Sequence, residues 1–218
     1  MSLFGLDPSS ILARVRAQPQ AVKAPSLLES AVGGGLGFCL VSAVVFGTVA
    51  FAEKWLYTHA GLWGTYLIWT LLFIGGGGVV FNRLITAPGC PLRFYAVFAL
   101  SFLLYAAAWT AAYFALKGVL GEWVGVVAGA LVMAWFFCGA FGCLEMWLRV
   151  GAVLLGGNIA GYFIGRLAWA GIGGKAGMLS WGILYGLAVG AGIGSALHIC
   201  QAKVRQALSD QWKRTPRT

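Results

Sequence analysis

Long apolar stretches separated by short polar segments occupy most of the chain between residues 31 and 200. Six stretches are long enough to cross a hydrocarbon layer, which requires about 20 residues of helix. They run unbroken rather than in alternating ten-residue pieces, and a helix satisfies every backbone group internally, as a bilayer requires. The pattern therefore predicts an all-α integral membrane protein, a bundle of six transmembrane helices. The predicted spans are 31–52, 62–82, 94–116, 124–147, 150–170 and 178–200.

The composition agrees with lipid as the solvent for most of the chain. Hydrophobic residues make up 60% and charged residues 10%, with a mean hydropathy of +0.85. Ordinary soluble domains carry about 25% charged residues. The first 30 residues lack the apolar core and cleavage site of a secretory signal, so we expect the first span to direct insertion. The predicted organisation is a cytoplasmic N-terminal tail (1–30), a membrane domain (31–200) and a basic amphipathic C-terminal tail (201–218).

Glycine recurs at every fourth position in three of the predicted spans. Residues four apart share one face of a helix, and glycine on that face lets a neighbouring helix approach closely within lipid. The spacing therefore predicts glycine-zipper packing between spans. The predicted helix-packing glycines are Gly121, Gly125, Gly129, Gly157, Gly161, Gly165, Gly182, Gly186, Gly190 and Gly194.

Four successive glycines, Gly75, Gly76, Gly77 and Gly78, stand within the second predicted span. Each glycine weakens a helix by roughly 1 kcal/mol relative to alanine, so another feature must compensate. One interpretation is a helix break whose freed backbone groups line a polar path, as in transporters. The other is an intact helix that crosses a neighbour at very short distance.

Lysine and arginine are distributed unevenly between the two sides of the predicted spans. Of the 15 such residues, four (Lys54, Lys117, Arg166 and Lys175) would lie outside if the N terminus is inside, which leaves eleven on the inner segments. This bias predicts that both termini are cytoplasmic, by default in a bacterial cytoplasmic (inner) membrane. The net charge of +9 is then mainly a topology signal. No nucleic acid partner is expected, since no binding motif accompanies the basic residues.

Both tails have the pattern of short amphipathic helices. In the N-terminal tail, Asp7 can cap a helix whose apolar side carries Ile11. In the C-terminal tail, Val204, Leu208 and Trp212 share one face, while basic residues occupy the others. Such helices lie at a membrane surface and are attracted by anionic lipid headgroups. The simpler alternative is that the tails only anchor the bundle.

Polar and ionisable residues inside predicted spans are the usual functional candidates in a membrane protein. Glu145 and Arg149 lie four residues apart, where an ion pair can form on one helix face. Arg166 is the deepest base and is expected either to extend towards the surface or to meet Asn158. The simpler alternative is that these charged residues only flank the spans and form no site. The candidate polar site comprises Arg83, Glu145, Arg149, Asn158, Arg166 and His198, of which the first three and His198 are predicted to share one depth.

Signatures of enzymes, metals and cofactors are missing from the sequence. The two histidines, His59 and His198, fall on opposite sides of the predicted membrane, which disfavours a two-histidine metal or haem site. The five cysteines lie in or near spans without ligand spacing and are expected to be small core residues. We therefore expect no catalytic residues, no metal and no cofactor.

Two functional hypotheses follow from these patterns. The first is a non-catalytic multipass protein that works as a packing, assembly or lipid-interacting component, because the glycine faces are extensive and buried charge is scarce. Glycine faces also allow homo- or hetero-oligomers. The alternative is a small channel or transporter for an ion or small solute, based on the glycine run at Gly75 and on Asn158 and Arg166.

Overall fold

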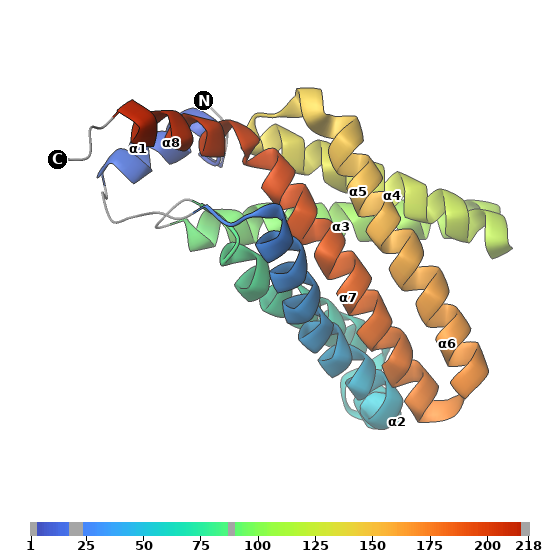
Figure 1. Cartoon of the computed structure of the whole chain (residues 1–218). Coiled ribbons are helices and arrows are strands. Elements are labelled where there is room, and N and C mark those ends of the chain that lie inside the picture. The colour runs from blue at the N-terminus through green and yellow to red at the C-terminus, as the bar shows by residue number, and fades with distance from the viewer. Residues whose placement is uncertain (1–3, 18–23, 87–89, 215–218) are drawn as a thin grey trace.

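The structure, a computed structural model, describes residues 4–17, 24–86 and 90–214, with side chains up to residue 210. Within these ranges the chain forms helices and no strands (Figure 1). Five helical segments are long and apolar enough to cross a membrane, so the fold is compatible with a membrane protein. The helices are α1 (Pro8–Ala17), α2 (Leu27–Asn82), α3 (Pro91–Leu116), α4 (Gly118–Phe141), the 3-10 turn η1 (Leu144–Met146), α5 (Trp147–Ile159), the π turn η2 (Ala160–Ile164), α6 (Gly165–Ile172), α7 (Gly174–Cys200) and α8 (Ala202–Arg214).

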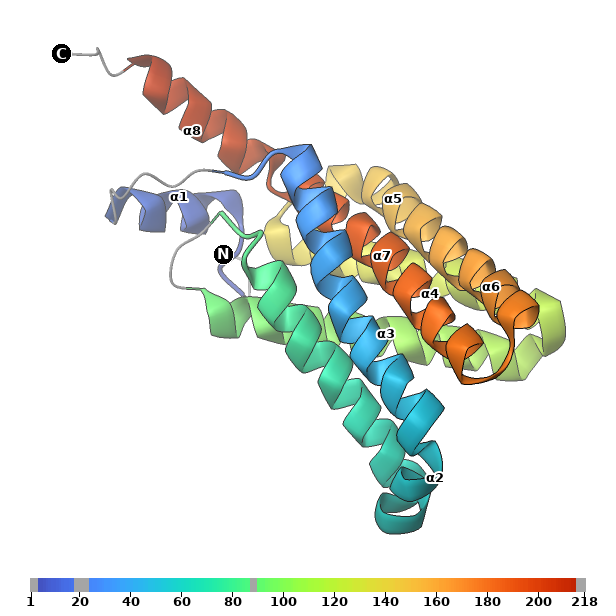
Figure 2. The same ribbon diagram turned by 60° about the horizontal axis from the view of Figure 1, so that its bottom comes forward.

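The longest helix, α2, is a hairpin of two arms. Gly61 interrupts it with φ 67° and ψ −178°, and the chain reverses direction there (Figure 2). The arms run side by side, since Trp69 Nε1 donates a hydrogen bond to Thr48 Oγ1 at 3.0 Å. The predicted spans 31–52 and 62–82 both lie in α2, one in each arm. For this reason the sequence suggests six spans where the structure has five separate long helices.

Local sequence accounts for where the helices begin and end. Ser26 and Glu29 form a capping box at the start of α2, with hydrogen bonds of 3.1 and 2.7 Å to each other's backbone N–H. Pro91 occupies the first turn of α3, where its missing N–H costs nothing. Between α6 and α7 the chain turns at Gly173, whose φ of 71° favours glycine.

The glycine run does not break its helix. Residues 75–78 are helical throughout, and within α2 the non-helical residue is Gly61. A methyl group at Gly76 would lie 2.8 Å from the side chain of Val41, and one at Gly77 would lie 2.7 Å from the Phe98 ring. Of the two interpretations of Gly75–Gly78, the helix break does not occur, and the run belongs to an intact helix. Gly76, Gly77 and Gly78 instead let side chains of neighbouring segments pack against the helix axis, whereas a methyl group at Gly75 would meet no atom within 4 Å.

Helix α7 is the centre of the bundle. It lies between α2 on one side and α5–α6 on the other, while α3 and α4 pair with each other (Figures 1 and 2). Helices α1 and α8 lie at one end, and the turns at Gly61 and Gly173 lie at the other. The interior that α7 shares with its neighbours is therefore the place where predicted site residues can meet.

The two tail helices pack against each other instead of presenting free apolar faces. Ile11 of α1 is fully buried, and Val204 and Leu208 of α8 are 1% and 8% exposed within the same apolar cluster. The side chain of Trp212 lies outside the described residues. The apolar face predicted to insert at a membrane surface is thus covered by protein, because two amphipathic helices can shield one another.

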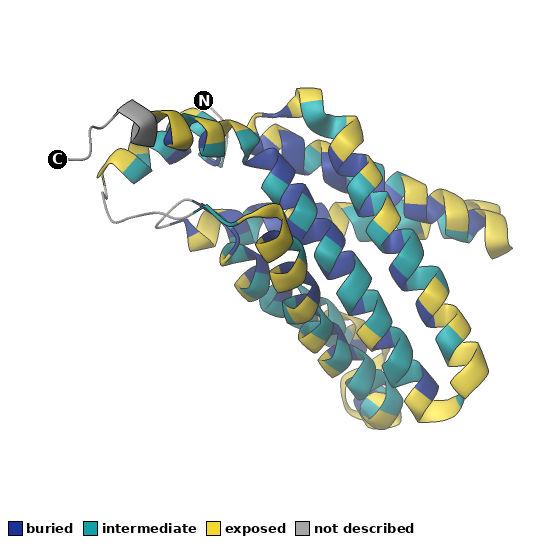
Figure 3. Ribbon diagram, in the orientation of Figure 1, coloured by how far each residue is buried: buried dark blue, intermediate teal, exposed yellow. Residues whose placement is uncertain are grey.

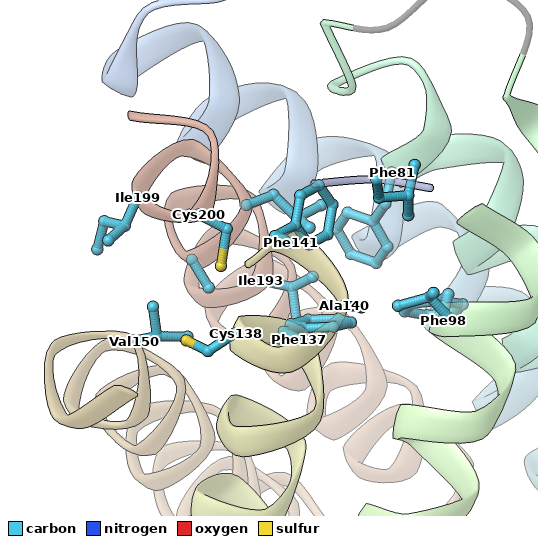
Figure 4. Packing of buried hydrophobic residues seen from close by; sticks show 14 of the residues in the cluster. Phe81, Phe98, Phe137, Cys138, Ala140, Phe141, Val150, Ile193, Ile199 and Cys200 are labelled. Atoms are coloured by element: carbon cyan, nitrogen blue, oxygen red, sulfur yellow. The ribbon is translucent and has the colours of Figure 1, made fainter. Parts of the chain in front are cut away.

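Side-chain burial separates a packed interior from an apolar exterior. Buried positions follow the inward sides of α4 and α7 (Figure 3), and phenylalanines such as Phe81, Phe98 and Phe137 fill the space between helices (Figure 4). The outward surface carries large hydrophobic side chains, for example Leu28 at 72% and Trp63 at 84% exposure. An exposed apolar surface of this kind is compatible with lipid as the surrounding solvent.

Candidate functional site

The most buried polar residue of the predicted site, Asn158, lies in the middle of the bundle. It is 3% exposed. Its Oδ1 accepts a hydrogen bond from the Tyr105 hydroxyl at 2.8 Å, and its Nδ2 donates to the Leu154 carbonyl at 3.0 Å. The adjoining cavity has a volume of about 10 Å³ and is lined mainly by apolar and aromatic side chains, including Phe38 and Ile193. That volume accommodates roughly one water molecule.

A π turn begins two residues after Asn158. Residues 150–170 were expected to form one regular helix, but η2 (Ala160–Ile164) inserts a wider turn between α5 and α6. Within it, a methyl group at Gly161 would lie 3.1 Å from the backbone of Tyr185 in α7. Turns of this type are rare and are frequent at functional sites. The hydropathy pattern of the sequence contains no signal for it.

Arg166 pairs with Glu122 and not with Asn158. The guanidinium Nη1 donates to the Glu122 carboxylate, which joins α6 to the first turns of α4. The Arg166 side chain is 44% exposed, whereas that of Glu122 is 13% exposed. Of the two alternatives expected for Arg166, the contact with Asn158 does not form, because the long arginine side chain reaches a carboxylate on another helix and the amide oxygen of Asn158 is already occupied by Tyr105.

The four residues predicted at one depth are not joined. Among the described residues, no hydrogen bond or ion pair links any two of Arg83, Glu145, Arg149 and His198. Glu145 pairs with Lys203 of α8 at 2.5 Å. The predicted Glu145–Arg149 pair does not form, because Glu145 belongs to the 3-10 turn η1 and the α-helix begins only at residue 147. His198 Nδ1 instead lies 3.2 Å from the Pro25 carbonyl oxygen.

Two sides of α7 meet neighbouring helices at backbone distance. Towards α2, a methyl group at Gly34 would lie 2.5 Å from the Gly190 carbonyl oxygen. Towards α5, a methyl group at Gly157 would lie 2.7 Å from the Ala188 carbonyl oxygen. Gly34 was not among the glycines singled out in the sequence. The predicted glycines on these two sides of α7 are Gly157, Gly161, Gly182, Gly186, Gly190 and Gly194.

Of the remaining predicted glycines, Gly125, Gly129 and Gly165 meet aromatic side chains, whereas Gly121 meets backbone atoms. A methyl group at Gly129 would lie 2.6 Å from the Tyr105 ring, and one at Gly125 would lie 2.9 Å from the Trp109 ring. Gly121 faces the same helix, α3, while Gly165 faces an indole of α7. Aromatic rings of one helix therefore lie directly against glycine positions of the next.

Three buried thiols come together at the end of the bundle that carries the two tails. The Sγ atoms of Cys138, Cys143 and Cys200 all lie within 4.8 Å of one another. All three are free, and none is more than 2% exposed. Cys138 and Cys200 lie at the edge of the apolar cluster near Val150 (Figure 4). The sequence pattern predicted small core residues at these positions, and the group that they form was not predicted.

A helix-ending motif brings two of the thiols together. Gly142 ends α4 in the left-handed conformation (φ 66°, ψ 38°). The Cys143 N–H then donates to the Cys138 carbonyl at 2.8 Å, and the Gly142 N–H donates to the Gly139 carbonyl at 3.4 Å. These bonds define a Schellman motif, in which the side chains of Cys138 and Cys143 occupy the positions that normally contact each other. The cysteines on either side of a helix-ending glycine were thus a signal in the sequence that Cys138 and Cys143 lie together. No such signal placed Cys200 beside them.

Charged groups border the thiol cluster on its outer side. Hydrogen bonds from the Cys138 and Cys200 thiols lower the pKa of Cys143, which lies outside the membrane-spanning helices. The nearby Lys203 is held by Glu145, and that hydrogen bond raises the pKa of the Lys203 ammonium. The arrangement favours a thiolate at Cys143 with two sulfur donors beside it.

No protein family model, curated protein or solved structure matches this chain. The interpretation of its sites therefore depends on the geometry described above. That geometry contains two groups that differ from ordinary packing, the hydrogen-bonded centre at Asn158 and the three-thiol cluster at Cys138, Cys143 and Cys200.

Proposed function

We propose that this chain is a non-catalytic multipass membrane component that works in packing and assembly or in lipid interaction. The observation that carries this proposal is the closed centre of the bundle. Both polar ends of the Asn158 amide are occupied, by Tyr105 and Leu154, and the adjoining cavity of about 10 Å³ holds roughly one water. A solute path would require a longer series of polar groups than this.

We further propose that the chain crosses the membrane six times, with both termini in the cytoplasm of a bacterial cell. The hairpin at Gly61 supports two crossings by α2, since each arm is long enough to span a hydrocarbon layer. The excess of lysine and arginine on the tail-bearing side supports the orientation.

Glycine-zipper packing is the proposed source of cohesion. The close approaches of Gly190 to Gly34 and of Gly157 to Ala188 support it, because dispersion between closely spaced helices drives association in lipid. The same proposal includes assembly with a second copy of the chain or with another membrane protein. It does not include a nucleic acid partner.

Attraction of the tails by anionic lipid headgroups would be electrostatic. Arg16 of α1 and Lys203 of α8 are exposed, whereas the apolar faces of both helices are buried. Each basic residue near an anionic surface contributes about 1 kcal/mol. Such attraction would weaken as salt concentration rises.

A small channel or transporter remains the second candidate because of one specific observation. The π turn Ala160–Ile164 follows the buried Asn158 on the same helix. Loss of that wider turn would rotate α6 relative to α5, and the Asn158–Tyr105 pair could then open. This candidate requires a second conformation with a continuous polar path.

A flux assay with the purified chain in liposomes distinguishes the two candidates. Ions and small neutral solutes are tested with wild-type protein, Asn158→Leu and empty liposomes. We expect wild-type flux to equal that of empty liposomes for every solute. Flux above that background that disappears in Asn158→Leu would overturn the proposal and favour a transporter.

A further inference from the structure

We propose that Cys138, Cys143 and Cys200 bind one thiophilic metal ion, and that monovalent copper suits the site best. This inference goes beyond the assembly role and is independent of it. It depends on the position of three sulfur atoms from three parts of the fold, at the end of α4, after its terminal glycine and at the end of α7.

The distances between the sulfur atoms fit a single shared ion. Three sulfurs bound to one ion at about 2.3 Å each would lie about 4 Å apart. In the structure, the Sγ atoms of Cys138, Cys143 and Cys200 are all within 4.8 Å of one another. Small side-chain rotations are therefore sufficient for binding, and the backbone does not have to move.

The backbone around the site is already fixed. The Schellman motif at Gly142 holds Cys143 over Cys138. Cys200 closes the last turn of α7, where the following residue, Gln201, is anchored by hydrogen bonds to Thr86 N–H and to the Leu84 carbonyl. Ligands on anchored segments lose little conformational freedom on binding, which favours affinity.

The donor set selects a soft ion with a low coordination number. Within the described residues, the group of potential metal ligands contains three cysteines and neither histidine nor carboxylate. Thiolates favour monovalent copper, zinc and iron–sulfur clusters, whereas Mg²⁺ and Ca²⁺ require oxygen ligands. Structural zinc takes four protein ligands. Three buried sulfurs without a fourth protein ligand therefore suit monovalent copper better than zinc.

Proton and charge balance are compatible with this assignment. Each thiol that binds the ion releases its proton to water, so binding is favoured as pH rises. The Glu145–Lys203 pair is about half exposed on both sides.

The test is an anaerobic titration of the purified, reduced chain in detergent with monovalent copper against a chromophoric copper chelator. We expect one copper per chain. Cys138→Ser, Cys143→Ser and Cys200→Ser should each weaken binding by roughly 100-fold or more, since even changes to groups that only contact the ligands cost about 10- to 100-fold. The matched control is Cys39→Ser, because Cys39 lies in α2 outside the thiol group and should leave binding unchanged.

Two measurements keep the test decisive if a serine variant folds poorly. X-ray absorption of copper-loaded wild-type chain should give a first shell of three sulfurs, and a shell that contains nitrogen or oxygen would contradict the site. A parallel titration with Zn²⁺ should give weaker binding, and tighter binding of zinc would overturn the preference for copper. Absence of binding by both ions, or wild-type affinity for copper in all three serine variants, would overturn the proposal.

Discussion

At the residue scale, adjacent glycines in one helix have opposite roles. Gly157 lies against the backbone of α7, where an added methyl group would be 2.7 Å from the Ala188 carbonyl oxygen. A methyl group at Gly156 would meet no atom within 4 Å. The same residue type is therefore required at one position and dispensable at the next, because helix rotation decides which side faces α7.

The pair Gly156→Ala and Gly157→Ala tests this difference. Gly157→Ala should lower the free energy of unfolding by about 1–3 kcal/mol, since an added carbon must separate two backbones. Gly156→Ala should leave it unchanged or raise it by up to about 1 kcal/mol, through the higher helix propensity of alanine. Reversible unfolding in detergent measures both. Equal effects of the two substitutions would refute close packing at Gly157.

A second residue-scale prediction concerns the hydrogen bond between Tyr105 and Asn158. Tyr105→Phe and Asn158→Leu should each destabilise the fold by about 1–3 kcal/mol, because each leaves a buried polar group without its partner. The double variant should lose less than the sum of the two. Coupling between polar side chains in membrane proteins is about 0.6 kcal/mol and reaches about 1.7 kcal/mol. A double-mutant cycle measures it, and strict additivity would show that the bond contributes nothing.

At the scale of elements, the reversal of α2 depends on one backbone conformation. Gly61 combines φ 67° with ψ −178°, a region that is essentially restricted to glycine. A methyl group there would meet no atom within 4 Å. The constraint on residue 61 is thus conformational and does not come from crowding.

Gly61→Ala should therefore destabilise the α2 hairpin by about 1–3 kcal/mol. Gly47→Ala is the matched control, since Gly47 is helical in the same element and equally free of neighbours. It should be neutral or stabilising by up to about 1 kcal/mol. Thermal unfolding of both variants in detergent gives the comparison. If Gly61→Ala unfolds at the wild-type temperature, the turn does not depend on glycine.

At the scale of the whole molecule, the two ends of the bundle differ in character. One end holds both tail helices, the thiol cluster and the Glu145–Lys203 pair. The other holds the turns at Gly61 and Gly173. A membrane that contains the bundle would place these two ends in different compartments if every long helix and both arms of α2 cross it.

Cysteine labelling in intact cells tests this arrangement. In a Cys39→Ser background, Thr58→Cys and Gly171→Cys should react with an impermeant thiol reagent, since both positions are exposed at the turn-bearing end. Ala13→Cys and Ser209→Cys, exposed on the tail helices, should react only after permeabilisation. The reverse pattern would invert the proposed orientation. Reaction of only one tail position would mean an odd number of crossings.

The sequence by itself determined the features that depend on one segment and its solvent. The apolar stretches predicted a helical membrane protein, and most of them lie within long helices once the arms of α2 are counted separately. The stretch 124–147 is the exception, because α4 ends at Phe141 and the 3-10 turn η1 follows. Hydropathy and helix periodicity are local properties, so a single segment contains enough information to reveal them. The lack of enzyme motifs and the proposed orientation stay predictions.

Only the tertiary structure decided which side chains meet. Arg166 binds Glu122 instead of Asn158, and Cys200 joins two cysteines about sixty residues before it in the chain. Such contacts depend on the depth and rotation of one helix relative to another, which a segment's own sequence does not specify. In a bundle whose helices are apolar on nearly every side, hydrophobicity gives no preferred face. The close fit of glycines and aromatic rings between helices sets that rotation. The rotation in turn brings the polar side chains to their partners and, at a separate place, brings the three thiol groups to one another.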